Sequence, residues 1–434
     1  MADLFDKTEI NGMVLSNRFI RSATWEGMAT DEGGCTPRLI GLLRDLSAGG
    51  VGLIITGHSY IRQDGQHSPR QLGIHQDTLI PALQSLTRSV HEFGSKIVLQ
   101  LGFGGAYLSK SRIRSMSASD FQALAEDYGR AAIRAKKAGF DGVQIFAAHG
   151  FFLSQMLCPR YNDRTDEYGG TLANRSRALL AVYDAIRKAV GRDYPVLVKL
   201  NCRDFVDNGL ALEDSIKIAG LLETVGIDAI ELSGGLLNNP NILRSRIDSK
   251  DTSGYFVPEA KAFREKIRVP LILVGGIRSY EAARALVVED VVDYISMSRP
   301  FIREPGLINR WQRGDRREAA CISCDNCFEP LKKGQGVACL PLEPEADETF
   351  FPQFSELVPA SAPHPPGTSY KVSIGLENWG LNFIPVLKIQ MFSNGRLTEQ
   401  SPSFPLGTRD HQNVTQAMVD LLEKHRTAQQ QRDW

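Results

Sequence analysis

The stretch Asp141–Arg177, DGVQIFAAHGFFLSQMLCPRYNDRTDEYGGTLANRSR, decides the fold. It begins with an apolar run typical of a buried strand and continues through a loop that carries His149. After the turn at Gly169-Gly170 it enters a helix. In a barrel of alternating strands and helices, the loop after each strand holds the active-site side chains. We therefore expect one unit of a (β/α)8 barrel here, with His149 at the active-site rim.

Short β-branched or apolar runs recur along the chain, and segments of helical periodicity separate them. Eight parallel strands alternating with helices favour a (β/α)8 TIM barrel in the α/β class. A doubly wound sheet is the alternative, and it is disfavoured because no Gly-x-Gly-x-x-Gly follows the first strand. The predicted strands are Phe19–Thr24, Val51–Gly57, Lys96–Leu101, Gly142–Phe146, Val196–Leu200, Ala229–Leu232, Leu271–Val274 and Asp293–Met297.

The composition is that of an ordinary globular protein, with 42% hydrophobic and 23% charged residues among 434. Lys+Arg and Asp+Glu both count 50, so no global field attracts nucleic acid or an anionic membrane. The N-terminal residues lack a signal-peptide pattern, and no apolar run reaches ~18 residues. We expect a cytoplasmic protein with a small-molecule substrate and no nucleic-acid or membrane partner; a homo-oligomer is compatible with the sequence.

The barrel pattern ends near Trp311, and different material follows it. We expect a barrel at residues 1–318, a four-cysteine segment at 319–345, a Pro-rich linker at 346–369 and a small α+β extension at 370–434. The extension contains YKVSIGLENWGLNFIPVLKIQMF, which predicts two strands, and NVTQAMVDLLEKHRTAQQQ, which predicts a helix. We assign it no chemistry.

The four-cysteine segment has the spacing Cys-x2-Cys-x2-Cys-x11-Cys. Thiolates two residues apart can converge on a metal from one tight loop, and a fourth can return beyond a Gly-containing turn. Three close cysteines and a distant one favour a 4Fe–4S cluster, whereas zinc usually takes two separated Cys-x2-Cys pairs. Zinc and metal-free thiols remain the alternatives. The candidate ligands are Cys321, Cys324, Cys327 and Cys339.

The last two predicted strands end in LILVGGIRS and YISMSRPFI. The loops after strands 7 and 8 form the usual phosphate site of this fold. Gly275 and Gly276 allow backbone N–H groups to approach phosphate oxygens closely, and Arg299 offers a bidentate clamp. A glycine turn beside a surface arginine is the alternative for either loop alone. Both loops together predict a phosphate-bearing ligand.

Three further segments lie at the ends of predicted strands: NRFIRSATWEG, IVLQLGFGG and PVLVKLNCRDF. With Asp141–Arg177 and the two phosphate loops, they make the chain resemble the old yellow enzyme family of FMN-dependent oxidoreductases. The resemblance covers about residues 3–340. It implies FMN as the cofactor and NAD(P)H as the reductant.

The resemblance also implies which residues hold the flavin ring. Ser22, Ala23 and Thr24 correspond to the residues that line the flavin edge, mainly through backbone groups. Gln100 corresponds to the side chain that binds the pyrimidine part, and Lys199 to a cation beside the flavin N1–C2 carbonyl region. A fixed positive charge there would stabilise the anionic reduced flavin.

The remaining implied roles concern phosphate and substrate. Gly276, Ser298 and Arg299 match the phosphate-binding positions. His149 matches the second member of a His-x-x-His or His-x-x-Asn pair that hydrogen-bonds the substrate's carbonyl oxygen. His58, also at a strand end, is an open candidate for facing the flavin.

Three positions depart from the family pattern and line the expected substrate pocket. Phe146 replaces the first histidine of the pair, Phe151 replaces the tyrosine that protonates the substrate carbon, and Trp25 replaces a Thr or Cys. Phenylalanine can neither donate a hydrogen bond nor give up a proton. Either another group substitutes, with Tyr161 and Tyr255 as candidates, or the substrate is not a typical enone.

The four-cysteine segment itself resembles that of trimethylamine dehydrogenase and 2,4-dienoyl-CoA reductase. Three hypotheses follow. The first is an enzyme that moves hydride from NAD(P)H through FMN to an activated alkene or similar acceptor. The second is an FMN dehydrogenase that passes electrons through an iron–sulfur cluster to an electron-transfer protein. The third is a flavin-binding scaffold with little turnover.

Overall fold

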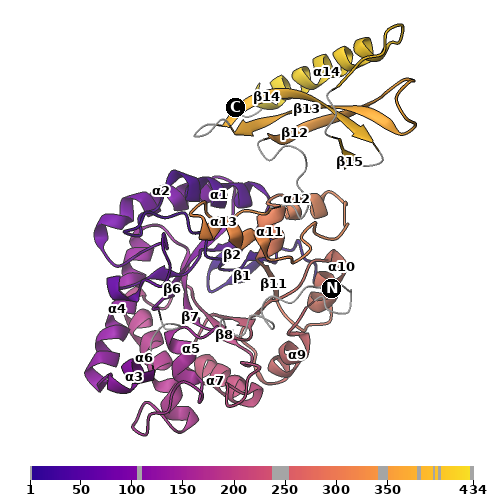
Figure 1. Ribbon diagram of the computed structural model, residues 1–434. Helices are drawn as coiled ribbons and strands as arrows, with labels where there is room; N and C mark the ends of the chain where they lie inside the picture. Colours follow the sequence, from indigo (N-terminus) through magenta and orange to yellow (C-terminus); the bar gives the residue numbers. More distant parts are fainter. Residues whose placement is uncertain are drawn as a thin grey trace. The chain divides into compact units, whose positions relative to one another are not determined.

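The computed structural model describes residues 2–104, 110–236, 254–340, 350–378, 383–393, 396–398 and 402–430. The chain divides into two compact units, Met1–Leu340 and Pro341–Trp434 (Figure 1). Among the described residues, no helix combines the length and the apolar character that crossing a membrane requires.

The first unit is a closed barrel of eight parallel strands with helices around it (Figure 1). Each strand pairs with the next along the chain, and the last pairs with the first, which closes the sheet. The TIM-barrel prediction and all eight predicted strands are thereby confirmed. The barrel strands are β3 (Phe19–Arg21), β4 (Leu53–Ile55), β6 (Lys96–Gly102), β7 (Gly142–Ala147), β8 (Val196–Asn201), β9 (Ala229–Ser233), β10 (Leu271–Val274) and β11 (Tyr294–Met297).

Helices follow the strands and cover the outside of the barrel (Figure 1). Helix α4 begins with a reciprocal capping box between Ser117 and Asp120, which satisfies two otherwise unpaired N–H groups. Gly139 and Gly226 follow α4 and α7 with φ of +84° and +90°, as the sequence predicts for helix ends. The main helices are α1 (Pro37–Ala48), α2 (Ile80–His91), α4 (Ala118–Lys137), α6 (Leu172–Val190), α7 (Leu212–Val225), α9 (Val257–Lys266), α10 (Tyr280–Val288), α11 (Arg299–Arg303) and α12 (Leu307–Gln312). Three others are α3 (Lys110–Ser115), α5 (Phe152–Leu157) and α13 (Glu329–Lys332).

A small hairpin closes the end of the barrel where the strands begin. It consists of β1 (Thr8–Ile10) and β2 (Met13–Leu15), which pair antiparallel. Ile10, Met13 and Leu15 are buried in one cluster with residues from the barrel strands, including Ile20 and Tyr294. The opposite end, where the strands finish, is left for the side chains that carry chemistry.

The second unit is a four-stranded antiparallel sheet with one helix. Its strands are β12 (Phe350–Pro359), β13 (Thr368–Asn378), β14 (Phe383–Ser393) and β15 (Arg396–Leu397), in that order, and its helix is α14 (Asp410–Gln430). Tyr370 and Val372 of the sheet form a buried cluster with Val414, Ala417 and Leu421 of α14. The two strands and the helix predicted for the extension are present.

Strand β12 lies inside the range 346–369, which the sequence predicts to be a linker, so that part of the prediction is corrected. The prolines Pro352 and Pro359 suggested a linker, but β12 is at the edge of the sheet, where a missing N–H is tolerated. The pairing register with β13 shifts between Pro352 and Phe354. Val358 is buried in the small core of the second unit.

Candidate active site

A buried polar network lies inside the barrel and joins side chains of β6, β7, β8, β9 and β11 to Ser22, which follows β3. The Glu231 carboxylate accepts hydrogen bonds from the hydroxyls of Ser22 (2.7 Å) and Ser296 (2.9 Å). It also accepts one from Gln144 Nε2 (2.9 Å) and lies 3.1 Å from Lys199 Nζ. The members are at most 3% exposed: Ser22, Gln100, Gln144, Lys199, Glu231 and Ser296.

The pairing register explains why these side chains meet. Lys199 of β8 is the direct partner of Glu231 of β9, and Gln100 of β6 is the direct partner of Gln144 of β7. Gln100 Nε2 donates to Gln144 Oε1 (2.7 Å), which extends the network to β6. Partners on parallel strands point to the same face, so one register places both pairs inside the barrel.

The network holds an ion pair away from water. Burial raises the pKa of Glu231, but Lys199 and the hydrogen bonds from Ser22, Gln144 and Ser296 outweigh burial and leave it below its ordinary value. Burial lowers the pKa of Lys199, whereas Glu231 opposes that shift. With this many donors around it the carboxylate is ionised, and the ammonium 3.1 Å away keeps its proton. Lys199 is thus a fixed cation at the rim.

The residues after β3 are tied to those after β11. Ser22 N donates to the carbonyl of Met297 (2.9 Å), and the hydroxyls of Thr24 and Ser298 are 2.6 Å apart. Ala23 is half-buried against the barrel interior. These contacts place the predicted flavin-edge residues directly beside one of the predicted phosphate-binding residues.

The predicted phosphate corner combines a glycine turn with Arg299. Gly275 and Gly276 have φ of +131° and +79°, which L side chains rarely adopt. A Cβ at Gly275 would lie 2.9 Å from the ring of Phe256. The Arg299 guanidinium donates to Asp325 Oδ1 (2.6 Å) and to Tyr255 Oη (3.3 Å). Arg299 therefore already has an anionic partner, one from the four-cysteine segment.

His149 follows β7 in a left-handed backbone conformation, with φ of +61°. That conformation is uncommon for a residue with a side chain and is found preferentially at functional sites. Its Nε2 is 2.7 Å from Ser233 Oγ, and its N–H donates to Asn201 Oδ1 (3.2 Å). Burial, Lys199 and His58 lower the pKa of His149 to about 3, so its imidazole is neutral at physiological pH.

An aromatic cluster of His58, His67, Phe146 and Phe151 lies beside His149. The ring centroids of Phe146 and Phe151 are 4.4 Å apart, and His58 lies 4.8 Å from Phe151. The Phe146 ring is also 5.8 Å from that of His149. The His58 Nε2 atom is buried and has no hydrogen-bond partner among the residues that the structure describes. The two phenylalanines and His149 are thus brought together, as the sequence predicts.

The residues present fit a flavin mononucleotide. One end of the rim offers an arginine and a positive-φ glycine turn, and the other offers the Lys199 ammonium and the Gln100 amide. Trp25 Nε1 is buried with no hydrogen-bond partner among the described residues, as is expected where a ligand completes a site. Asp325 competes with a phosphate, because its carboxylate already pairs with the Arg299 guanidinium.

The two tyrosines proposed as substitutes for Phe151 lie in different parts of the barrel unit. The Tyr255 hydroxyl accepts from Arg299, which places it at the phosphate corner. Tyr161 follows α5, where its backbone N–H donates to the carbonyl of Cys158 (3.1 Å).

The predicted cysteine ligands are free thiols, and within the described part of the chain no three metal-binding side chains are placed to share one ion. Burial, Asp325 and two other cysteines raise the pKa of Cys327 to about 12, although Arg299 opposes this. Burial also raises the pKa of Cys339, and Cys321 and Cys324 contribute. The four thiols are thus near enough to affect one another. The metal assignment stays a prediction.

The four-cysteine segment packs on the loop that follows β3. Val337 N donates to the carbonyl of Glu26 (2.8 Å), and a side chain at Gly27 would collide with Leu331. Glu26 is itself paired with buried Arg21 (2.8 Å). The segment therefore lies against the same loop that carries Ser22–Trp25.

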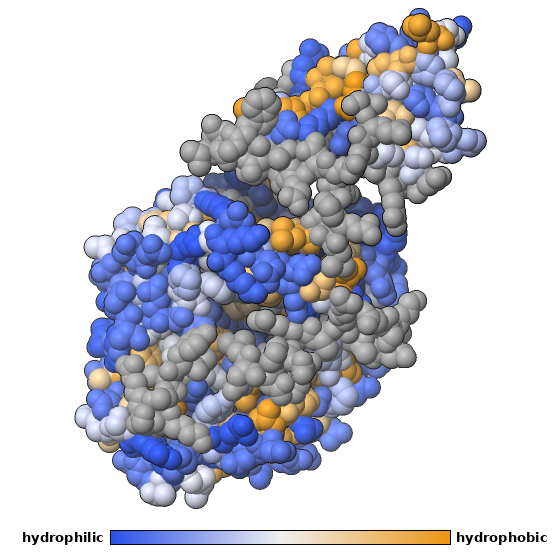
Figure 2. Space-filling model, in the orientation of Figure 1, coloured by the Kyte–Doolittle hydropathy of each residue, from blue (hydrophilic) through white to orange (hydrophobic). Residues whose placement is uncertain are grey.

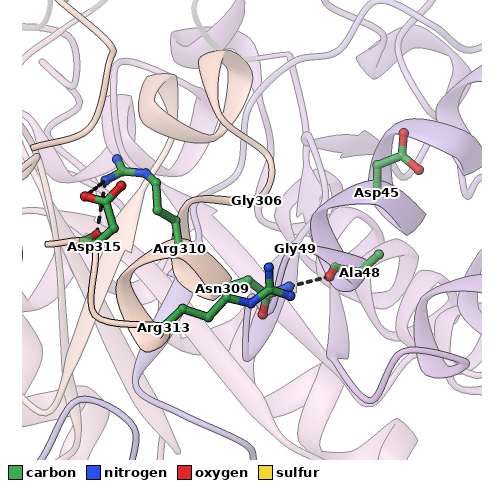
Figure 3. A pocket seen from close by; sticks show the side chains of 8 residues that line it. All are labelled: Asp45, Ala48, Gly49, Gly306, Asn309, Arg310, Arg313 and Asp315. Atoms are coloured by element: carbon green, nitrogen blue, oxygen red, sulfur yellow. Dashed lines mark hydrogen bonds and ion pairs between the residues drawn. The ribbon is translucent and has the colours of Figure 1, made fainter. Parts of the chain in front are cut away.

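A separate cavity of about 520 Å³ lies between α1 and the α12 region (Figure 3). The end of α1 leads into the start of β4, so this cavity is toward the amino ends of the strands. Arg310 is paired there with Asp315, and Asn309 donates to the carbonyl of Ala48 (2.7 Å).

The visible surface around the units is mostly hydrophilic, with scattered apolar side chains (Figure 2).

The sequence interpretation missed four members of the buried network and the aromatic cluster: Glu231, Gln144, Ser296 and His67. Glu231 had a signal, since a carboxylate in the buried strand Ala229–Ser233 requires a partner. Gln144 had the same signal, as an amide in a buried strand. His67 had none, because it lies in a loop and reaches the aromatic cluster only through the fold.

Known proteins are similar to this chain over most of its first unit. The model of the NADH:flavin oxidoreductase / NADH oxidase family matches residues 3–114 and 108–318. NADPH dehydrogenase from Bacillus subtilis is 32% identical over 70% of this chain and 92% of its own length. NADH oxidase from Thermoanaerobacter brockii is 29% identical over 74% of this chain and 53% of its own, so the chain spans about half of that relative. The structure of an old yellow enzyme homologue from Zymomonas mobilis matches with a TM-score of 0.62 and 26% identity, over 74% of this chain and 96% of that one.

Proposed function

The chain belongs to the NADH:flavin oxidoreductase / NADH oxidase family, and we propose that it is an FMN-dependent enzyme of the old yellow enzyme type. It moves hydride from NAD(P)H to an activated alkene or a similar small-molecule acceptor. One observation carries this proposal: the buried Lys199–Glu231 pair lies at the same rim as the Gly275-Gly276 turn and Arg299. FMN, when bound, accepts a hydride from one substrate and gives it to another.

In this proposal Lys199 supplies positive charge to the pyrimidine side of the flavin. Its ammonium donates to Ser22 Oγ (2.7 Å) and pairs with Glu231, so its position is held before any ligand arrives. A preorganised charge of this kind stabilises negative charge without reorganisation. Gln100 supplies an amide on the same side, and the backbone of Ser22–Thr24 lines the ring edge.

The phosphate is held at the other end by the Gly275-Gly276 turn, Ser298 and Arg299. Positive φ at both glycines directs backbone N–H groups without an intervening side chain. Arg299 gives a charge-assisted hydrogen bond, a contact worth about 1.5–3 kcal/mol. Asp325 pairs with Arg299 in the structure. To bind a phosphate, the guanidinium must therefore either contact the phosphate and Asp325 together or give up its ion pair with Asp325.

His149 binds the acceptor oxygen of the substrate. Its imidazole is neutral, because its pKa lies near 3, and a neutral imidazole donates through one ring nitrogen and accepts through the other. Ser233 Oγ lies 2.7 Å from Nε2 and can donate or accept there, so it holds the ring in place in either tautomer. Trp25, Phe146 and Phe151 form the apolar walls that exclude water.

Anaerobic mixing with NADPH or NADH tests the proposal. We expect the flavin absorbance to bleach and to return when an activated alkene is added. His149→Ala should slow the second step more than the first, while His411→Ala, an exposed histidine of the second unit, should change neither. A flavin that NAD(P)H leaves oxidised would instead support the scaffold hypothesis.

A second function is favoured by the docking of the four-cysteine segment on the β3 loop, through Val337 and Glu26. In that case the enzyme is a dehydrogenase, and the four cysteines would hold a 4Fe–4S cluster, which would supply electron transfer from the flavin site to a partner protein. Iron and sulfide analysis of anaerobically purified protein tests this. About four irons per chain would support the cluster, and one zinc or no metal would exclude it.

A further inference from the structure

His149 is held at two points by the ends of two neighbouring strands. Its backbone N–H donates to Asn201 Oδ1 (3.2 Å), and its ring Nε2 lies 2.7 Å from Ser233 Oγ. Asn201 is the last residue of β8, Ser233 is the last residue of β9, and the two are direct partners in the strand register. Partners on parallel strands point to the same face of the sheet. One pair of strand ends therefore holds both the backbone and the ring of His149.

We propose that Asn201 is a positioning residue for His149, because its side-chain amide ties the His149 backbone to the ends of β8 and β9 and so sets where the imidazole meets the substrate. This inference rests on the proposed function, in which His149 binds the acceptor oxygen, and it adds a residue that acts through His149. Asn201 is 0% exposed, so its side chain has no surface from which to contact a substrate.

The Asn201 amide uses both of its ends. Its oxygen accepts from His149, and its Nδ2 donates to Asp204 Oδ1 (2.8 Å) and to the carbonyl of Gly235 (2.8 Å). The opposite orientation of the amide would place its nitrogen against the His149 N–H and its oxygen against two acceptors, so this network selects one orientation. Since Gly235 follows β9, one side chain links the ends of β7, β8 and β9.

The His149 backbone needs such a partner. His149 and Gly150 are consecutive residues with φ of +61° and +84°, and a left-handed histidine persists only where its surroundings fix it. The Gly150 N–H donates to Ser154 Oγ (3.1 Å), whereas the N–H of His149 itself depends on Asn201. Removing this acceptor frees His149 to return to the right-handed or extended region, which changes the direction of its Cα–Cβ bond and moves the ring.

Asn201 is itself held from the side of α7. Ser215 Oγ, in α7, donates to the Asn201 carbonyl (2.6 Å). Asp204 is 0% exposed, and its second carboxylate oxygen accepts from the Leu210 N–H (2.8 Å). The loop from β8 to α7 therefore fixes the amide that positions His149.

Hydrogen exchange of the His149 amide in the flavin-loaded protein tests the contact without any substrate. Asn201→Leu keeps the side-chain size but removes the acceptor, and we expect the His149 amide to exchange at least about 10-fold faster than in the native protein. Asn17→Leu is the matched control at the amino end of the barrel. The Asn17 amide likewise accepts from a backbone N–H, that of Phe19 (3.0 Å), and donates to a glycine carbonyl, that of Gly50 (2.8 Å). It should leave the exchange of His149 within about 3-fold of native, and an equal change in both variants would overturn the inference.

A double-variant cycle tests whether Asn201 acts through His149. Asn201→Leu should slow the anaerobic reoxidation of the reduced flavin by cyclohexenone about 10- to 100-fold, as expected when a binding group is misplaced. In the His149→Ala background the same substitution should change this rate less than about 2-fold, because the group that it positions is gone. Equal losses in both backgrounds would show that Asn201 only supports the barrel, and would overturn the inference. Asn17→Leu should change neither rate.

The native protein decides if Asn201→Leu does not fold or if cyclohexenone is not reduced. Its His149 amide should exchange at least about 100-fold more slowly than an unstructured amide, and an unprotected amide refutes the contact. Failure of the inference is separable from failure of the proposed function. Protein that binds no flavin, or that reduces the alkene at the native rate as His149→Ala, rejects the proposed function or its His149 role. A large loss in His149→Ala beside a native rate in Asn201→Leu rejects Asn201 alone.

Discussion

Replacing Glu231 with Gln tests whether the buried network holds Lys199 as a fixed cation. The substitution keeps the side-chain size but removes the charge 3.1 Å from the ammonium, in a position with 0% exposure. Ser22 and Ser296 both donate to the same carboxylate oxygen of Glu231. A glutamine amide can accept both hydrogen bonds only in the orientation that places its oxygen at that position. Removing one partner of a buried ion pair costs about 3–5 kcal/mol, and we expect the free energy of unfolding to fall by that amount.

Urea unfolding of Glu231→Gln, Lys199→Met and the double variant measures the effect. Glu231→Gln leaves the Lys199 ammonium buried without its anion, and Lys199→Met removes that ammonium. The loss in free energy of unfolding of the double variant should therefore be about 1–3 kcal/mol smaller than the sum of the two single losses. Additive losses would refute the network as an electrostatic unit. If Glu231→Gln lowers the free energy of unfolding by less than about 1 kcal/mol, Glu231 is not part of a buried ion pair.

The pH dependence gives an independent check on the same residue. The folded-state pKa of Glu231 is lowered, so its contribution to stability is present above its unfolded pKa of about 4.3 and is lost as pH falls through the lower folded value. Glu231→Gln should therefore lose less stability than the native protein over this acid range. An identical acid profile in the two proteins would contradict the assignment.

Three further predictions concern the rest of the site. Arg299→Ala should weaken FMN binding about 10- to 100-fold, since it removes a charge-assisted contact, and unchanged flavin retention would refute the phosphate assignment. Cys324→Ser should abolish broad absorbance near ~400 nm beneath the flavin bands, and absorbance that survives excludes a cluster ligated by this thiol. Because the pKa values of His58 and His149 lie near 3, both bind protons only on unfolding below about pH 6.5. Each should lower the free energy of unfolding by up to about 1.4 kcal/mol per pH unit as pH falls toward 3. Urea titrations of the single His→Phe variants at pH 7 and 5 should show a smaller acid loss than the native protein.

The barrel was predictable because its strands carry strong local signals. Each predicted strand is a buried apolar run between helical segments, and parallel strands buried on both faces read in this way. Lys199 and Gln100 were proposed as site residues because they match positions of the family that the sequence resembles, and each is also a polar side chain in such a run. Glu231 and Gln144 are also polar side chains in apolar runs, but neither matches the family motifs, so neither was proposed.

Other features depend on contacts between distant segments. The Arg299–Asp325 ion pair joins a barrel loop to the four-cysteine segment, and the local sequence around either residue does not predict it. Tyr255 lies at the phosphate corner, although its sequence position also allowed a place beside the substrate. Strand β12 was hidden by Pro352 and Pro359, because an edge strand tolerates prolines that a central strand would exclude.

FMN binding to the flavin-free protein, followed by absorbance and calorimetry, tests the central claim most directly. We expect one FMN per chain, binding that weakens on Arg299→Ala and Lys199→Met, and a bound flavin that NAD(P)H reduces without oxygen. Protein that takes up no flavin nucleotide, or whose uptake ignores both substitutions, would contradict it.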